Sequence, residues 1–270
     1  MTESLTQALG KIEAFGDFLC EGAVPRPGSE YAAESGELTG VQTWSAAVEA
    51  GLSGLDHLHY FADTTIKARR VTAFASFTVL RSAISAVALA GWLISGDRTE
   101  RLTRTLTLRR LEASNQITAV DEIINAPRGP AESAYARKRR EQATKKRADL
   151  LAVQNTIDED AVRLELDLAK ITRMPRDWQL VKIAADLVDP AEYHDFGASR
   201  ESVLTWRVLS AYAHGQIWAA NMSARTVVDP DGIHMTTWAP DRDFLMQGFT
   251  AAWDLMYGAF DRYIDLAGAR

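Results

Sequence analysis

Apolar side chains recur at three- and four-residue steps along most of the chain. This spacing is typical of amphipathic helices, because residues three and four apart share one side of an α-helix. It predicts a largely helical protein. The predicted helices cover residues 3–21, 41–66, 68–94, 97–125, 175–187, 199–222 and 240–264.

One helix boundary is marked by its own local residues. Gly96 follows the apolar stretch that ends at Ile94, and glycine easily adopts the left-handed backbone found just after a helix. Asp97 and Glu100 have the spacing of a capping box, in which each side chain accepts a hydrogen bond from the other residue's backbone N–H. We therefore expect one helix to end before Gly96 and the next to begin after Asp97.

Two segments differ from this amphipathic pattern. Residues 131–172 are strongly charged and thinly apolar, which favours a long exposed helix or a helical hairpin. Residues 226–238 are rich in β-formers on both sides of a DPDG turn, which predicts a β-hairpin. The predicted fold class is therefore all-α, a multi-helix bundle with long helices and one small β-hairpin.

The domain organisation follows from the irregular stretch near the N-terminus. Residues 1–24 form a predicted N-terminal helix, and residues 25–40, rich in proline and glycine, form a predicted linker or irregular surface arm. Residues 41–270 form the predicted helical domain, with an exposed charged segment at 131–172.

Composition narrows the class of protein. A net charge of −6 means that any site for a polyanion must be a local basic patch. The single cysteine, Cys20, excludes an internal disulfide and a cysteine-based zinc site, and it is typical of a reducing cytoplasm. No phosphate-binding loop or dinucleotide fingerprint occurs in the sequence, so we expect no cofactor. His57 and His59 diverge on a helix, so we expect no metal.

The apolar stretch 71–94 is long enough to span a membrane, but Arg81 stands at its centre. A charged side chain at mid-span is costly in lipid. We therefore expect a buried helix of a soluble, cytoplasmic bundle, and a membrane anchor is the weaker interpretation.

A polar line on the helix predicted for residues 199–222 is the main candidate for chemistry. Arg207 and His214 are seven positions apart, so they lie about 20° from eclipsed on a helix. Ser210 and Asn221 fall within roughly 60° of Arg207 on the same helical wheel. A base and a cation on one face are what metal-free RNA cleavage needs. The alternative is that these residues are core polar groups bonded to neighbouring helices.

Two further sets of basic residues are weaker candidates. Arg81 is either a second cation for the same site or a buried arginine neutralised by an acid such as Asp186 or Glu201. The run at 137–147, together with Arg98, Arg101 and Arg104, either guides a phosphate backbone or forms a solvated helix face. The interleaved acids in that run favour the solvated face.

Two stretches carry a family resemblance. VLRSAISAVALAGWLISGDRTERLTRTL and WRVLSAYAHGQIWA resemble segments of actinobacterial helical proteins that are similar to the HEPN superfamily, defined by an Arg-x4–6-His motif. The resemblance implies an all-helical bundle with Arg207 and His214 as the motif pair. It also implies a metal-independent ribonuclease that works as a dimer, often in a toxin–antitoxin or phage-defence system, although other members are non-catalytic. The chain departs from the pattern at Val208, where active members usually carry Asn, Asp or His, and at Ser85, where relatives often carry Glu.

Two functional hypotheses follow. In the first, the chain is a metal-independent endoribonuclease, with His214 as general base, Arg207 stabilising the phosphate, and Ser210, Asn221 and Arg81 in binding roles. Its expected partners are RNA or a nucleotide, a second copy of the chain, and an antitoxin-like protein. In the second, the chain is a non-catalytic helical module that binds a partner protein or a nucleotide.

Overall fold

The computed structural model describes residues 2–21, 23–68, 72–127, 133–188, 198–216, 218–219, 225–228, 231, 234–237 and 242–269. Its contacts divide the chain into two compact units. Unit 1 comprises Met1–Ala33, Trp44–Ser95 and Pro175–Arg270, and unit 2 comprises Glu34–Thr43 and Gly96–Met174. The sequence predicted a boundary at residue 41, where the helical domain was expected to begin. In the structure, each unit contains residues from before and after this position.

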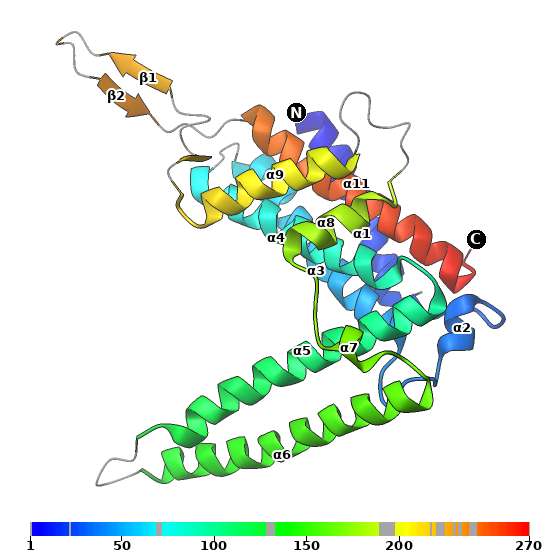
Figure 1. Cartoon of the computed structure of the whole chain (residues 1–270). Helices are drawn as coiled ribbons and strands as arrows, with labels where there is room; N and C mark the ends of the chain where they lie inside the picture. The colour runs from blue at the N-terminus through cyan, green and yellow to red at the C-terminus, as the bar shows by residue number, and fades with distance from the viewer. Residues whose placement is uncertain are drawn as a thin grey trace. The chain divides into compact units, whose positions relative to one another are not determined.

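Unit 1 is a bundle of helices (Figure 1). The predicted helical bundle is therefore confirmed for the described residues, and most helix ends lie close to their expected positions. The helices are α1 (Thr2–Glu21), α3 (Thr43–Ala68), α4 (Ala73–Ile94), α8 (Asp177–Ala185), α9 (Ala198–Ala213) and α11 (Arg242–Ala267), with short α2 (Glu30–Glu34) shared between the two units.

Helix α4 is central to unit 1, where it packs against α8, α9 and α11. Its inward side chains, such as Leu80 and Ile84, are fully buried. Gly91 allows α8 to approach closely, because a Cβ atom at residue 91 would lie 2.6 Å from the Cβ of Ala184. The side chains on this helix face are therefore set by close packing of α4 against its neighbours.

The segment Phe74–Ile94 of α4 is long and apolar enough to cross a membrane by length and composition alone. Within the bundle, 61 % of its most apolar window is buried against the rest of the protein. This burial is what the core helix of a bundle requires, and it gives the apolar stretch a role without lipid.

The segment after α1 is not a free linker. Tyr31 is buried and its ring centroid lies 5.6 Å from that of Tyr263 in α11. The Tyr263 hydroxyl donates to the carbonyl of Ala23, and burial raises the pKa of Tyr263. The N–H of Arg26 donates to the carbonyl of Ala267 at 2.9 Å. The expectation of a linker over residues 25–40 was therefore wrong, because these aromatic and backbone contacts are not visible in local composition.

Two short strands stand in the region where the sequence predicts a hairpin. Strand β1 (Arg225–Val228) pairs antiparallel with β2 (His234–Thr237), and Arg225 lies opposite Thr237. They form a two-stranded sheet.

Unit 2 is built on an antiparallel pair of long helices, α5 (Arg98–Asn125) and α6 (Ala134–Arg163), which lie side by side in Figure 1. Short α7 (Leu168–Ile171) packs against α5. The capping box of Asp97 and Glu100 is present at the start of α5, and Gly96 has a φ of +83°. This predicted helix boundary is confirmed. The charged segment predicted as a long helix or hairpin contributes α6, and its partner in the hairpin is α5.

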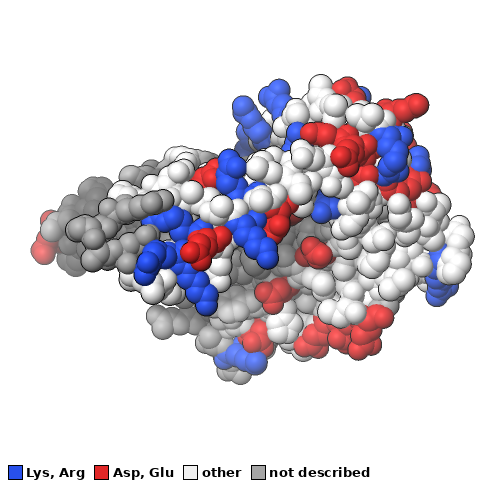
Figure 2. Space-filling model, turned by 90° about the horizontal axis from the view of Figure 1, so that it is seen from below, with Lys and Arg blue, Asp and Glu red and all other residues white. Residues whose placement is uncertain are grey.

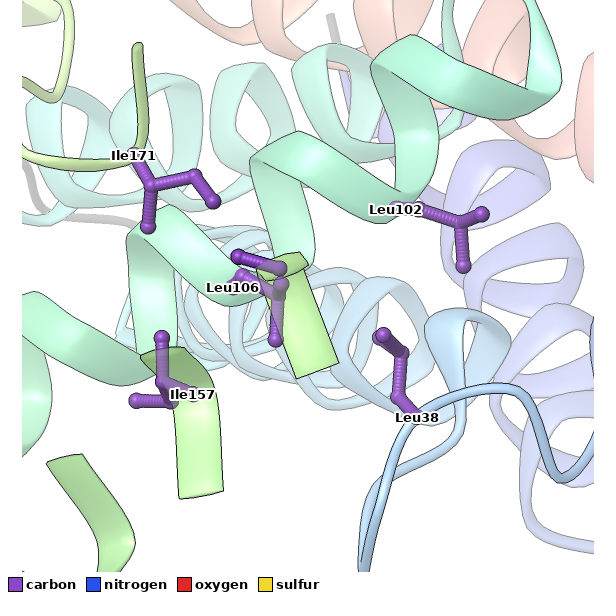
Figure 3. Packing of buried hydrophobic residues seen from close by; sticks show 6 residues of the cluster. Leu38, Leu102, Leu106, Ile157 and Ile171 are labelled. Atoms are coloured by element: carbon purple, nitrogen blue, oxygen red, sulfur yellow. The ribbon is translucent and has the colours of Figure 1, made fainter. Parts of the chain in front are cut away.

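The apolar core of unit 2 lies at one end of the helix pair. Leu102 and Leu106 of α5 meet Ile157 of α6, Ile171 of α7 and Leu38 from the preceding segment (Figure 3). Since Leu38 is 3 % exposed, the second half of the expected linker belongs to a core as well.

A buried ion pair lies beside this core. Arg101 and Glu34 are each 1 % exposed, and Arg101 Nε donates to Glu34 Oε1 at 2.9 Å. Thr43 Oγ1 donates to the other carboxylate oxygen at 2.8 Å, and an Arg101 Nη1 proton is accepted by the Gly96 carbonyl. The charges are therefore paired and hydrogen-bonded, as buried charges must be.

A second buried carboxylate, Asp160, holds the segment around Thr39 against α6. Asp160 accepts hydrogen bonds from the Thr39 N–H at 2.6 Å, from the Thr39 hydroxyl at 2.9 Å and from Arg163. Burial alone would raise the pKa of Asp160, but these hydrogen bonds outweigh it, so the pKa lies below its usual value.

Candidate functional site

Helix α9 carries Arg207, ends one residue before His214 and is amphipathic. Its buried face includes Ser202, Thr205, Val208 and Leu209. Arg207 is exposed on the opposite side. The buried face therefore includes small and hydroxyl-bearing side chains beside the apolar ones.

Helix α9 ends earlier than predicted. Its last helical residue is Ala213, and Gly215 has a φ of +65°, which is the left-handed backbone that favours glycine. The N–H of Gly215 donates to the Tyr212 carbonyl at 3.0 Å, and the N–H of Gln216 donates to the Ala211 carbonyl at 2.9 Å. These two bonds form a Schellman motif, so the His-Gly pair of the sequence is a helix end. Asn221 lies outside the described residues.

His214 is the last residue before that glycine and is exposed. Its backbone N–H donates to the Ser210 carbonyl at 3.1 Å, which keeps it in register with the helix. In the described part of the chain, no hydrogen bond or ion pair engages its imidazole ring. Ser210 itself is half-buried one turn earlier. The structure therefore places His214 at an accessible helix end.

Arg207 is held by an aromatic ring. Its Cζ lies 5.8 Å from the ring centroid of Trp178, which is half-buried in the first turn of α8. A guanidinium over an indole face is favoured electrostatically, and stacking leaves its N–H donors free at the edges. No contact joins Arg207 to His214. They are therefore not a mutually bonded core pair, and both are open to solvent.

Arg81 of α4 has a different partner from those expected. Its Nη2 lies 3.5 Å from Asp177 Oδ2 in α8, not near Asp186 or Glu201. Its Cζ lies 5.9 Å from the ring centroid of Trp206 in α9. The side chain is 26 % exposed, so Arg81 is neither fully buried nor fully solvated.

Ser85 of α4, one turn after Arg81, fixes the Trp206 ring. Trp206 Nε1 donates to Ser85 Oγ at 3.0 Å. Ser85 therefore has a structural role, because its hydroxyl satisfies the indole N–H.

Three helices contribute five side chains to what we call the Arg–Trp cluster: Arg81 contacts Asp177 and Trp206, and Arg207 contacts Trp178. It consists of Arg81, Asp177, Trp178, Trp206 and Arg207, from α4, α8 and α9. Sequence reasoning missed Asp177 and both tryptophans. The only local signal was the position of Trp206 next to Arg207, since the neighbours of Trp178 depend on how α8 packs.

The electrostatics of the Arg–Trp cluster favour an anion. The cluster contains two guanidinium groups and one carboxylate; Arg81 contacts that carboxylate, and the Asp177 side chain is 51 % exposed. His214 adds a base just past the end of α9, seven residues and about 10 Å along the helix axis from Arg207. The guanidinium of Arg207 can bind a phosphate group, and the imidazole of His214 can act as a base.

Two arginines of the basic run of α6 make contacts within the hairpin itself. Arg140 donates to the Ile124 carbonyl at the end of α5 at 2.6 Å, and Arg147 pairs with Asp121 at 2.7 Å. Arg101, grouped with this run from sequence, is buried against Glu34 and cannot meet a phosphate backbone. Figure 2 shows basic and acidic side chains intermixed over the described part of the face that it draws. The solvated-face interpretation fits these contacts better than a continuous basic track.

The comparisons with known proteins found no relative of the chain. No family model matches the chain, and neither a curated protein nor a solved structure matches it significantly.

Proposed function

We propose that the chain is a HEPN-like cytoplasmic protein that cleaves RNA without a metal ion at the exposed side of α9. The observation that carries this proposal is that Arg207 on α9 and His214 just after its end are both exposed, with no side-chain hydrogen bond to other described residues. The substrate must be able to reach both the catalytic base and the residue that binds its phosphate. His214 and Arg207 meet this requirement because both are exposed.

The proposed reaction uses the ribose as nucleophile. Neutral His214 takes the proton of a 2′-hydroxyl, and the 2′-oxygen attacks the adjacent phosphorus. The bond from phosphorus to the 5′-oxygen breaks, and the leaving oxygen takes a proton from water. The products are a 2′,3′-cyclic phosphate and a 5′-hydroxyl. Arg207 stabilises the negative charge that builds on the phosphoryl oxygens.

Val208 limits what α9 contributes to this reaction. It is 3 % exposed and packed in the core, so it adds no polar group beside Arg207. We propose that a second copy of the chain completes the site, in line with the dimers that the resemblance implies. An antitoxin-like protein that covers α9 is the corresponding inhibitory partner.

The experiment is incubation of the purified full chain with a structured RNA in EDTA, with separation of the products by gel. We expect cleavage that EDTA does not suppress and 3′ ends that resist phosphatase until the cyclic phosphate is opened. Cleavage that appears only with added divalent metal would contradict the mechanism.

A non-catalytic binding module is the second candidate, and one observation favours it. Leu204, one turn before Arg207, is 59 % exposed, and Trp218 beyond the helix end is 49 % exposed. Exposed apolar groups beside an arginine are typical of protein interfaces. This alternative predicts intact RNA in the same assay and complex formation with a protein partner that Leu204→Asp weakens.

A further inference from the structure

A cavity opens between α1 and α11, and none of its lining residues belongs to α9 or to the Arg–Trp cluster. Its volume is about 270 Å³. Its lining combines polar and apolar side chains from both helices, chiefly Gln7, Lys11, Met246, Phe249, Thr250 and Trp253. A closed aliphatic cavity of about 150 Å³ is large enough to hold benzene. The space between α1 and α11 therefore admits a flat group of one or two rings.

The two aromatic side chains of this lining are held in place by other rings. Trp253 stacks on Phe15 of α1, with ring centroids 5.6 Å apart and planes within 5° of each other. Phe15 in turn stacks on Phe260 at 4.1 Å, and Phe249 stacks on Phe61 of α3 at 5.8 Å. Rings that are already fixed lose little freedom when a ligand binds. The apolar part of the cavity is therefore preorganised for a planar group.

The polar side chains of the lining offer hydrogen-bond donors and one positive charge. Lys11 is the one charged residue among those that line the cavity. Among the residues that the structure describes, none forms a hydrogen bond or an ion pair with the side chains of Lys11, Gln7 or Thr250. An ammonium group has three donors, a carboxamide two and a hydroxyl one. This set favours an anionic group that carries oxygen acceptors.

We infer that the cavity between α1 and α11 binds a small planar carboxylate, an aromatic or heteroaromatic acid of one or two rings. The ring lies against Phe249 and Trp253, and Lys11 pairs with the carboxylate. Because the lining has a single cation, a singly charged carboxylate suits it better than a phosphate monoester, which carries close to two charges. This binding site is independent of the proposed ribonuclease reaction.

The test titrates the full chain with 2-naphthoate and, separately, with 2-naphthamide, which has the same rings and no charge. The seven tryptophan indoles are labelled with ¹⁵N, and Trp253→Phe identifies the signal of Trp253. We expect naphthoate to shift the Trp253 signal most, saturably and with a Kd of about 1 mM or below, as for a ligand of this size. Naphthamide should bind at least about threefold more weakly, because it cannot pair with Lys11.

Variants of exposed and lining residues locate the ligand. Lys11→Gln should weaken naphthoate binding about three- to fivefold, the range of an exposed charge pair, and should change naphthamide binding less than about twofold. Lys182→Gln is the matched control, because it removes a positive charge from an exposed position of α8, and it should change neither affinity. Ala8→Trp, at a half-buried lining position, fills the cavity and should abolish binding of both probes. Ala8→Leu replaces it if that variant does not fold.

Four results would overturn the inference. The first is the lack of a saturable shift of the Trp253 signal, and the second is equal affinity for naphthoate and naphthamide. The third is equal weakening by Lys11→Gln and Lys182→Gln, which would mean that only the overall charge matters. The fourth is undiminished binding by a folded variant with the cavity filled at Ala8, which would place the ligand elsewhere. No probe contains RNA, so none of these results depends on whether the chain cleaves it.

Discussion

The guanidinium of Arg207 lies over the indole ring of Trp178, with its Cζ 5.8 Å from the ring centroid. This contact orients the residue to which the proposed mechanism assigns phosphate stabilisation. We expect Trp178→Leu, which keeps apolar bulk but removes the π face, to lower the RNA cleavage rate about two- to fivefold, the range of an exposed cation–π interaction. Initial rates at saturating enzyme measure the effect. An unchanged rate in a variant that melts like the parent would show that the ring does not orient Arg207.

The ion pair of Arg101 and Glu34 should dominate the stability of unit 2. Glu34→Ala leaves a buried guanidinium without its partner, which we expect to cost about 3–5 kcal/mol in free energy of unfolding. Denaturant unfolding followed by circular dichroism measures the loss.

The exposed pair of Arg98 and Glu37 provides the matched control for this experiment. Arg98 is half-exposed, lies at the start of α5, the helix that also carries Arg101, and pairs with Glu37. Arg98→Ala should cost no more than about 1 kcal/mol. Equal losses for Glu34→Ala and Arg98→Ala would mean that burial does not govern the strength of the Arg101–Glu34 contact.

Asp160 predicts a loss of stability in acid. Its pKa is lower in the folded chain than the ordinary aspartate value of about 3.9, so the folded state favours the charged form. That contribution is fully present above about pH 4 and is lost as the pH falls through the folded-state value. Asp160→Asn should be less stable than the parent at pH 7, and its unfolding free energy should fall less steeply below pH 4.

The control for the acid experiment is Asp149→Asn, at an exposed position of the same helix. We expect this variant to follow the parent's stability across the whole pH range. Parallel pH curves for the parent and Asp160→Asn would contradict the role of Asp160.

Close packing at Gly91 predicts that a glycine-to-alanine substitution lowers stability there, whereas the same substitution at Gly10 raises it. Gly91→Ala places a methyl group 2.6 Å from the Cβ of Ala184, so we expect a loss of about 1–3 kcal/mol. Gly10→Ala, in α1, meets nothing within 4 Å and should gain about 0.5–1 kcal/mol by improved helix propensity. Thermal melting of both variants checks the signs. A stabilised Gly91→Ala would mean that α4 and α8 are less tightly packed than described.

The sequence predicted correctly those features that depend on residues close to one another in the chain. The end of α4 and the start of α5 were predicted because Gly96, Asp97 and Glu100 act within one turn of one another. The early end of α9 had an equally local signal in Gly215, but a glycine after His214 was interpreted as part of a motif. The long-range pairs had no such signal. Arg101 meets Glu34, 67 residues earlier, through packing that no pattern of spacing reveals.

The candidate site likewise combines residues that one helix brings together with residues that only the packing of several helices brings together. Arg207 and His214 could be found because their spacing puts them on one face of a predicted helix, and in the structure both are exposed, Arg207 on α9 and His214 just after its end. Asp177 and Trp178 could not be found, since they reach the site only through the packing of α8 against α4 and α9. The partner of Arg81 was missed for the same reason.

The most direct test of the account compares the RNA cleavage rates of two histidine variants in EDTA. His214→Ala removes the proposed base, whereas His59→Ala removes a partly exposed histidine of α3 whose Nε2 lies 3.6 Å from Glu13 Oε1. We predict that His214→Ala slows cleavage at least 100-fold, as loss of a general base does, while His59→Ala cleaves within about twofold of the parent. Equal cleavage by His214→Ala and the parent, or intact RNA with every protein, would contradict the claim that α9 carries a ribonuclease site.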